Sequence, residues 1–250
     1  MSVNFPTPPK LLKWSRNLDQ HYHTDQQILV TAGCSFTAST TQFECPASWP
    51  GYVLDRCGFD HCVDLSYPGV GNEFIANSIL NYVEELDPNM YCNILIMICW
   101  SGPSRKEELG NLKDSVQIDG VSYNRTKSNQ GLDQAETWRS WKNIIFTQNY
   151  LENKKIKFGF SLYCNVVEPM LLPRRDLTTD FATQLTPHKN AQLKNCTWIH
   201  DPKDSIFEFC FLNDDCLADD MFHPTAKGSL MWTDQVLLPG LAATNLITPK

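Results

Sequence analysis

The sequence has no apolar run long enough to span a membrane, and its first ten residues lack the segments of a secretory signal. A membrane helix needs roughly 20 consecutive apolar residues. A signal peptide places a basic segment ahead of an apolar one. We therefore expect a protein that is neither inserted into a membrane nor exported, and that stays in the cytoplasm.

Positive charge is also scarce. The chain has 21 Lys and Arg residues against 28 Asp and Glu residues, a formal net charge of -7. A nucleic-acid-binding protein normally presents a basic surface to the phosphates, so no nucleic-acid partner is expected. Repeats are absent, and 250 residues suffice for one core. We predict a single domain at 27–250 after a polar lead-in segment at 1–26.

The ten cysteines include no Cys-x-x-Cys pair, the spacing typical of many zinc and redox motifs. Several lie inside apolar runs, where a thiol behaves as a small buried hydrophobe. These are Cys92, Cys99, Cys164 and Cys210. We expect reduced thiols, no metal site and no cofactor.

Short apolar runs alternate with segments of helical periodicity. The predicted strands are 28–32, 62–65, 92–100, 156–163 and, as a last short strand, 206–212; the predicted helices are 48–57, 73–86, 135–153 and 225–238. Asp119-Gly120 predicts a hairpin over 116–121, and 165–204 is assigned as irregular. This alternation predicts an α/β fold, a three-layer α/β/α sandwich with a central parallel sheet of the flavodoxin-like kind. Such sheets bind ligands beyond the carboxyl ends of their strands.

Ser35 stands in the turn that follows the first predicted strand, within Gly33-Cys34-Ser35-Phe36-Thr37. A serine in such a turn can hold its hydroxyl at the sheet edge beside backbone N–H groups, which suits a nucleophile. The alternative is that Ser35 only caps the following turn, since serine is favoured there for its own hydrogen bond.

Asp220 and His223 are three residues apart in Asp220-Met221-Phe222-His223-Pro224. Because three residues make almost one helical turn, the carboxylate can accept from one ring nitrogen while the other nitrogen faces a partner. That arrangement produces an oriented general base. Alternatively, His223 is a packing residue and Asp220 caps the helix after Pro224.

Together these motifs resemble the SGNH (GDSL-like) hydrolases, whose first block is a Gly-x-Ser turn and whose last is Asp-x-x-His before the final helix. The resemblance covers four segments in order, Ile28 to Thr37, Asp64 to Ile75, Ile94 to Arg105 and Asp220 to Leu238. It implies an SGNH hydrolase fold in which Ser35 is the nucleophile, His223 the general base and Asp220 its orienting carboxylate.

The resemblance also implies an oxyanion hole, the set of donors that stabilises developing negative charge. The family uses the backbone N–H of the nucleophile, a glycine N–H after the second strand and an asparagine side chain after the third. Gly71 can supply the second donor, and Asn72 can add an amide. The third donor is missing, because Trp100-Ser101-Gly102-Pro103-Ser104-Arg105 replaces the usual Gly-x-Asn-Asp.

Three residues at the end of the third predicted strand and directly after it are therefore candidate site residues. Ser101 and Arg105 are candidates to replace the missing donor, and Arg105 would also favour an anionic group on the substrate. The alternative for Arg105 is a surface ion pair with Glu107 or Glu108. Trp100 is expected to be half core and half pocket wall. This variant pattern is similar to SGNH-like proteins encoded by tailed phages.

The leading functional hypothesis is a serine hydrolase acting on an ester-bearing small molecule or an acylated carbohydrate through an acyl-enzyme. A second is a binding or structural protein, conceivably a virion component, that keeps the SGNH fold without turnover. A third is a nucleotide-binding flavodoxin-like domain, suggested by Pro68-Gly69-Val70-Gly71-Asn72. That loop lacks the P-loop lysine and the full dinucleotide glycine pattern.

Overall fold

The computed structural model describes residues 25–38, 48–102, 105–109, 116–118, 121–127, 134–164, 187–220 and 222–247. The predicted lead-in at 1–26 lies almost wholly outside these residues. The strands are β1 (Ile28–Gly33), β2 (His61–Asp64), β3 (Ile94–Trp100), β4 (Arg105–Leu109), β5 (Val116–Ile118), β6 (Val121–Lys127) and β7 (Lys157–Leu162). The helices are α1 (Trp49–Cys57), α2 (Asn72–Glu85), α3 (Gln134–Lys154), α5 (Pro187–Lys194), α6 (Ile206–Leu212), α7 (Ala226–Trp232) and α8 (Leu238–Ala243). Two 3-10 helices, η2 (Pro88–Asn93) and η3 (Pro202–Asp204), and a π-helical turn, η4 (Thr233–Leu237), complete the elements.

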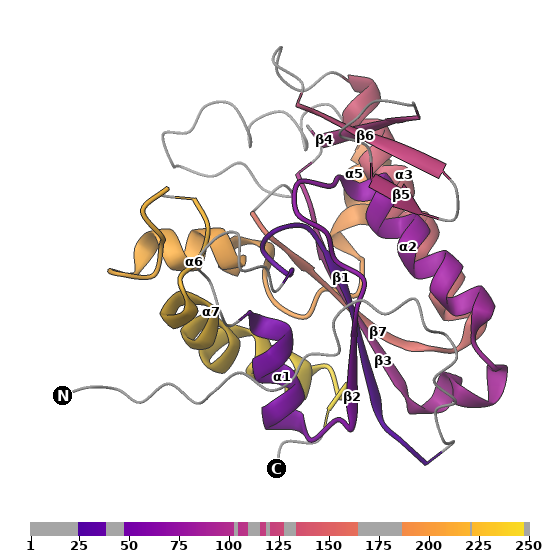
Figure 1. Cartoon of the computed structure of the whole chain (residues 1–250), viewed down its shortest axis with the longest axis horizontal. Helices are drawn as coiled ribbons and strands as arrows, with labels where there is room; N and C mark the ends of the chain where they lie inside the picture. Colours follow the sequence, from indigo (N-terminus) through magenta and orange to yellow (C-terminus); the bar gives the residue numbers. More distant parts are fainter. Residues whose placement is uncertain are drawn as a thin grey trace.

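A four-stranded parallel sheet in the order β2-β1-β3-β7 forms the centre of the molecule. Helices α1 and α7 lie on one side of this sheet, and α2 and α3 lie on the other (Figure 1). The three-layer α/β/α fold predicted from the alternating pattern is therefore confirmed. Parallel neighbours need crossover connections, which is why the helices are distributed over both faces.

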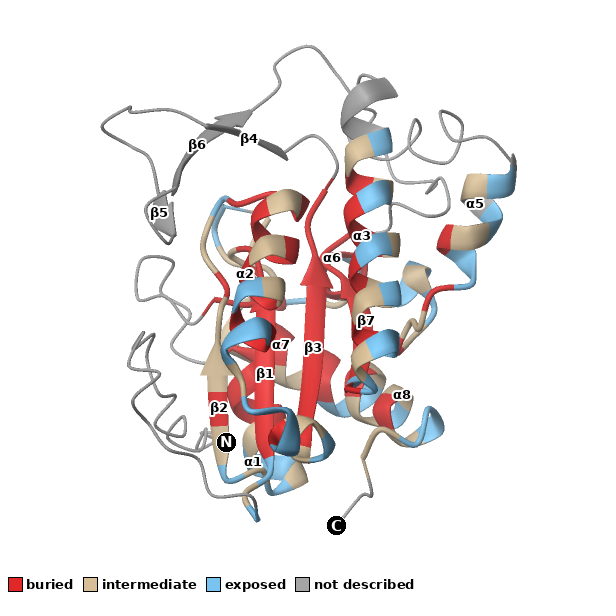
Figure 2. Cartoon of the chain, turned by 90° about the vertical axis from the view of Figure 1, so that its right-hand side faces the viewer, coloured by how far each residue is buried: buried red, intermediate tan, exposed pale blue. Residues whose placement is uncertain are grey.

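Burial of both sheet faces explains the uninterrupted apolar runs. Every residue of β1 and of β3 is buried, whereas β2 at the sheet edge is buried at only one position, Cys62. Figure 2 shows β1 and β3 buried along their whole length behind helices α2 and α3. A strand covered on both sides loses the apolar and polar alternation of a half-exposed strand.

A separate antiparallel sheet has the order β4-β6-β5. The predicted hairpin is confirmed, since Ile118 of β5 pairs with Val121 of β6 across Asp119-Gly120. The third strand, β4, was not predicted from the sequence. It begins at Arg105, so this residue pairs through its backbone with β6.

Two predictions about the second half of the chain are wrong. The segment Ile206–Leu212 is helix α6 and not a strand, and the span assigned as irregular contains helix α5. A seven-residue apolar run carries no period that distinguishes a buried strand from a short buried helix. In α6 the buried residues Ile206, Phe207 and Cys210 recur at helical spacing.

Strand register gathers the predicted functional turns at one edge. Gly33 of β1 pairs with Cys99 of β3, and Trp100 of β3 pairs with Leu162 of β7. Strands β1, β3 and β7 thus end together, and Asp64 ends β2 next to Thr31. The residues that follow these strands therefore emerge at the carboxyl edge, where ligands of open parallel sheets bind.

Candidate active site

The turn after β1 places Ser35 at the carboxyl edge of the sheet. The N–H groups of Thr37 and Ala38 both donate to the carbonyl of Cys34, at 2.9 and 3.0 Å, and close the turn. Within 28–38 Ser35 alone is not buried. A Cβ on Gly33 would stand 2.1 Å from Thr37 Oγ1, so the fold-back of this turn requires glycine.

His223 reaches Ser35 from the other end of the sequence. Ser35 Oγ lies 2.9 Å from His223 Nε2, a contact between residues 188 positions apart. On the other side of the ring, His223 Nδ1 lies 2.5 Å from Asp220 Oδ2. A carboxylate oxygen can only accept, so Nδ1 donates to it, and Nε2 of the neutral ring accepts the Ser35 proton.

The two oxygens of Asp220 act on different parts of His223. Oδ2 faces the ring, while Oδ1 accepts from the backbone N–H groups of Phe222 and His223, both at 2.9 Å. Asp220 and His223 thus lie in a turn closed by the aspartate side chain, not on a helix as their spacing had suggested. Partial burial alone would raise the pKa of Asp220, but hydrogen bonds from His223 and from the two backbone groups hold it below its ordinary value.

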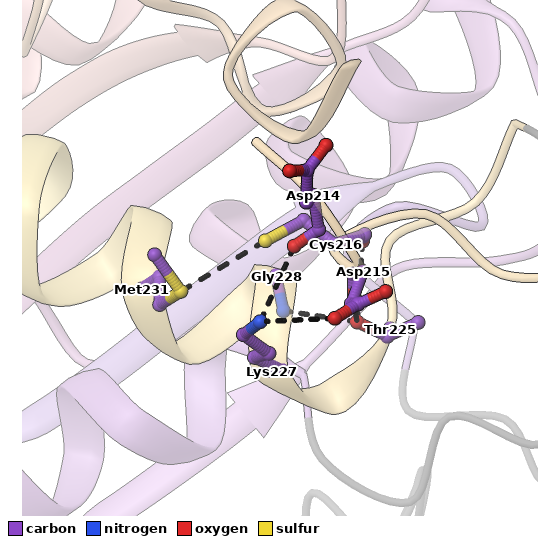
Figure 3. A network of polar contacts seen from close by, with 7 residues as sticks. All are labelled: Asp214, Asp215, Cys216, Thr225, Lys227, Gly228 and Met231. Atoms are coloured by element: carbon purple, nitrogen blue, oxygen red, sulfur yellow. Dashed lines mark hydrogen bonds and ion pairs between the residues drawn. The ribbon is translucent and has the colours of Figure 1, made fainter. Parts of the chain in front are cut away.

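A set of polar contacts holds the loop that carries His223 against helix α7 (Figure 3). Thr225, the N-cap of α7, accepts from the Gly228 N–H at 3.1 Å, and its hydroxyl donates toward the carbonyls of Asp215 at 3.1 Å and Cys216 at 3.2 Å. Lys227 Nζ lies 3.7 Å from Asp215 Oδ2. A Cβ on Gly228 would stand 2.3 Å from the Cys216 carbonyl oxygen, so the approach of loop and helix depends on this glycine.

Backbone pairing within the same loop completes the support of His223. The N–H of Ala218 donates to the His223 carbonyl at 2.8 Å, and the N–H of Thr225 donates to the Cys216 carbonyl at 2.8 Å. Leu217 and Pro224 form an antiparallel bridge between these bonds. The histidine therefore sits on a short, doubly tied ribbon, which limits the movement of its ring.

The predicted oxyanion residues occupy two different situations. Gly71 is the N-cap of α2, in extended conformation, after a turn in which Gly69 has a φ of 82°. Asn72 is buried and pairs with the backbone of Ser101: its Nδ2 donates to the Ser101 carbonyl at 2.9 Å, and its Oδ1 accepts from the Ser101 N–H at 2.7 Å. Asn72 therefore fastens the start of α2 to the end of β3.

Ser101 has a buried hydroxyl. The residue is 1% exposed, and its Oγ has no hydrogen-bond partner among the described residues. An unpaired buried hydroxyl costs stability. Thr37, Ser48 and Thr147 also have such hydroxyls, so the position of Ser101 directly after β3 is what makes it a candidate donor. Ser101 stands two residues past the register pair Gly33 and Cys99, as Ser35 does on the neighbouring strand.

Trp100 and Arg105, two residues of the predicted site, differ in what the structure shows of them: Trp100 is fully described, whereas only the backbone pairing of Arg105 is described. Trp100 is 0% exposed and packs edge-on against Phe160 at 5.3 Å between ring centroids, so its whole ring belongs to the core. The expectation that half of it lines a pocket is wrong. Arg105 is described only as the first residue of β4, so its role as donor or ion-pair partner stays a prediction.

Aromatic side chains around His223 were missed by the sequence reasoning. Phe36 lies 5.2 Å from the His223 ring and 4.8 Å from Tyr163, measured between ring centroids. Phe222 lies 5.3 Å from the same imidazole, edge to face. The signal was available in the sequence, because Phe36 directly follows Ser35 and Phe222 directly precedes His223.

The structure contains a second close Ser-His pair. Ser161 Oγ of β7 lies 2.8 Å from His200 Nε2, and His200 Nδ1 lies 2.8 Å from the Asp201 carbonyl oxygen. Ser161 is buried, and the group behind His200 is a neutral backbone carbonyl. This pair therefore lacks both the exposure of Ser35 and the carboxylate of Asp220.

The described part of the chain contains neither a candidate metal cluster nor a helix that could span a membrane. Within it no cluster of three or more His, Cys, Asp or Glu residues could hold a metal ion. Its nine cysteines, among them the buried Cys34 beside Ser35, form no disulfide. None of its helices combines the length and apolar character needed to cross a membrane.

The architecture matches solved structures with the SGNH hydrolase fold. TesA superposes with a TM-score of 0.51 at 14% identity, over 87% of this chain and 99% of that one. The psychrotrophic esterase EstA from Pseudoalteromonas sp., solved with monoethylphosphonate as inhibitor, superposes with a TM-score of 0.50 at 11% identity, over 88% of this chain and 97% of that one. The Bacillus subtilis protein YXIM gives 0.53 at 10% identity, over 88% of this chain and 57% of that one. At these identities the likeness establishes the fold.

Two sequence comparisons found no match. The chain matches no protein-family model, and no curated protein matches it. The structural neighbours therefore share an arrangement of helices and strands with this chain while almost all of their residues differ.

Proposed function

We propose that this protein is a serine hydrolase that cleaves esters through an acyl-enzyme, with Ser35, His223 and Asp220 as its catalytic triad. One observation carries the proposal: the only unburied residue of the first strand and turn is hydrogen-bonded at 2.9 Å to a histidine backed by a carboxylate. That combination is recognised by geometry and roles, whatever the order along the chain.

The residues have defined tasks in the proposed reaction. Ser35 Oγ bonds to the ester carbonyl carbon while its proton passes to His223 Nε2, and Asp220 stabilises the resulting imidazolium through Nδ1. The carbon–oxygen bond to the alcohol then breaks, and His223 returns the proton to the leaving oxygen. Water attacks the acyl-enzyme in the same way and restores Ser35.

Negative charge on the carbonyl oxygen needs donors at the carboxyl edge. The backbone N–H groups of Ser35 and Gly71 are two candidates, as the SGNH resemblance implies. We assign the third position to the Ser101 hydroxyl, because it is buried and unpaired, whereas Asn72 is engaged with the Ser101 backbone. Each such donor contributes roughly two to three powers of ten in rate.

Labelling with a fluorophosphonate probe tests the triad directly, because such a reagent bonds covalently to an activated serine. The structure of the neighbour EstA with monoethylphosphonate makes organophosphorus chemistry a suitable choice. We expect the wild type to be labelled at Ser35, and Ser35→Ala and His223→Ala to prevent labelling. Ser161→Ala is the matched control, since it removes the serine of the other Ser-His pair and should be labelled like the wild type.

The contrary outcome supports the competing hypothesis. If the folded wild type resists the probe and cleaves no short p-nitrophenyl ester, the triad geometry is not catalytic. An SGNH fold kept for binding or assembly would then be the better explanation.

A further inference from the structure

Aromatic rings lead from His223 to the protein surface. The imidazole lies 5.3 Å from the Phe222 ring, and Phe222 lies 5.5 Å from Phe207, centroid to centroid. Phe207 in turn lies 6.0 Å from Phe211, one turn further along α6. We call Phe222, Phe207 and Phe211 the aromatic strip. Its first ring, Phe222, contacts the imidazole of His223, the proposed general base.

The outer end of the aromatic strip is exposed. Phe207 is buried, whereas Phe211 is 40% exposed and its neighbour Leu212 is 70% exposed. Apolar patches left in solvent mark sites that contact ligands or partners, and Phe211 and Leu212 are neighbours in the sequence. Ring contacts connect this end of the strip to the candidate site. The strip is therefore placed to bind the part of a substrate that extends away from the reacting ester.

The position of the strip decides which part of the ester it faces. In the proposed reaction His223 returns its proton to the leaving oxygen, so that oxygen must come within hydrogen-bond reach of Nε2. The carbonyl oxygen points instead to the donors near Ser101. The alcohol portion therefore extends from the histidine side, where Phe222 and the rest of the strip lie.

We propose that the aromatic strip binds the alcohol portion of the substrate, and that the substrate class is an ester of an apolar alcohol, alkyl or aryl. The proposal rests on the hydrolase function proposed above. In the acylation step the bond from acyl carbon to Ser35 Oγ forms, the bond from that carbon to the alcohol oxygen breaks, and the alcohol leaves with the proton from His223. Phe211 and Leu212 contact the far end of the alcohol.

Two matched ester series test this assignment. One series keeps acetate and lengthens the alcohol from methanol to octanol; the other keeps methanol and lengthens the acid. We expect kcat/KM to rise about fourfold per added methylene in the alcohol series, the effect of burying one such group, until the chain passes Phe211. The acid series should respond much less.

Variants connect the effect to the strip. Phe211→Ala and Leu212→Ala should flatten the dependence on alcohol length, so that the ratio of kcat/KM for octyl acetate to kcat/KM for methyl acetate falls. Phe146→Ala is the control, because Phe146 is 54% exposed on α3, across the sheet from α6. It should keep the wild-type dependence. Phe211 and Leu212 are both exposed, so circular dichroism should show folded variants.

Each result supports or overturns the assignment. A dependence on acid length alone, or a dependence on alcohol length that survives both substitutions, would overturn it and would leave the hydrolase proposal intact. A strip that serves to dock a protein or a lipid surface would produce that second result. Absence of labelling at Ser35, with no hydrolysis in either series, would end both proposals together.

Discussion

Gly33 of β1 lies opposite Cys99 of β3, and two residues beyond each of them stands a serine. Ser35 carries the hydrogen bond to His223, and Ser101 carries the buried hydroxyl without a partner. Two neighbouring parallel strands thus bring one hydroxyl that is hydrogen-bonded to a histidine and one unpaired hydroxyl to the same sheet edge. This relationship is the basis of the oxyanion assignment, and it predicts an exchange of stability against activity.

Ser101→Ala should lower kcat by about 100-fold and raise the melting temperature. The activity falls because an oxyanion donor is lost. Stability rises because removing an unpaired buried hydroxyl relieves its desolvation cost, about 1 kcal/mol or more. Initial rates with p-nitrophenyl acetate and thermal denaturation followed by circular dichroism measure the two effects.

Ser78→Ala is the control for this substitution, since Ser78 is also buried but donates to the Phe74 carbonyl at 2.9 Å. It should keep its kcat and gain no stability. A Ser101→Ala enzyme with the wild-type kcat would show that the third donor lies elsewhere.

Asp220→Asn should reduce kcat by about 10³- to 10⁴-fold with little change in folding. An asparagine amide can donate to Nδ1, which moves the ring proton to Nε2 and removes the acceptor that Ser35 needs. The rate of fluorophosphonate labelling should fall in parallel. The neighbouring Asp219 is exposed, so Asp219→Asn provides the comparison. A loss of less than tenfold in Asp220→Asn would argue against the orienting role.

The sequence was sufficient to predict the parallel sheet, for physical reasons that particular residues show. The apolar run at Ile28–Gly33 is confined to a strand buried on both faces, and a parallel sheet brings the turns after its strands to one edge. The expectation that Ser35 and His223 meet came from the SGNH resemblance, and the two residues are in contact although they are 188 positions apart. Their catalytic role stays a prediction.

Contacts between side chains could not be predicted in the same way. The pairing of Asn72 with the Ser101 backbone depends on the height at which α2 starts relative to β3, which no local pattern encodes. Because the run at Ile206–Leu212 was predicted to be a strand, the ring contacts that connect His223 to Phe207 and Phe211 of α6 could not be predicted. Tertiary packing, rather than local preference, decided the conformation of that segment.

Thr225→Val should lower kcat about tenfold, because the His223 loop would lose its tie to α7. Valine keeps the shape of threonine but can neither accept from Gly228 nor donate to Cys216. Loss of such an N-cap costs about 1 kcal/mol of stability. Thr225→Ser retains the hydroxyl and should restore both kcat and stability, which a role in side-chain packing alone would not explain.

Thr244→Val is the control for general loss of a threonine hydroxyl, since Thr244 Oγ1 bonds to the Gly240 carbonyl near the end of α8. Its kcat should match that of the wild type. If Thr225→Val loses stability but keeps its kcat at temperatures where it is folded, the hydrogen bonds of Thr225 have no part in positioning His223.

His200 should make the protein less stable as the pH falls below about 6.5. Burial lowers the pKa of His200 from its ordinary value of 6.5, although the Asp201 carbonyl and the carboxylates of Asp204 and Asp201 oppose the shift. His200 therefore stays neutral in the folded protein at pH values where the same side chain binds a proton in the unfolded chain. The contribution of His200 to the free energy of unfolding is fully present above the pKa of His200 in the unfolded chain. It declines as the pH falls, by up to about 1.4 kcal/mol per pH unit, until the pKa of His200 in the folded protein is reached.

Urea denaturation between about pH 7.5 and 5 measures this slope. His200→Gln keeps an acceptor for Ser161 without a titrating ring, so its midpoint should vary less with pH than that of the wild type. His188 is exposed on α5, and His188→Gln should retain the full wild-type slope. Equal slopes in wild type and His200→Gln would mean that the acid sensitivity arises from other groups. A slope that is reduced in His200→Gln and unchanged in His188→Gln would assign the acid sensitivity to the contact between His200 and Ser161. Ser161 of β7 pairs with Cys99 of β3, so this contact lies close to the sheet edge that carries Ser35.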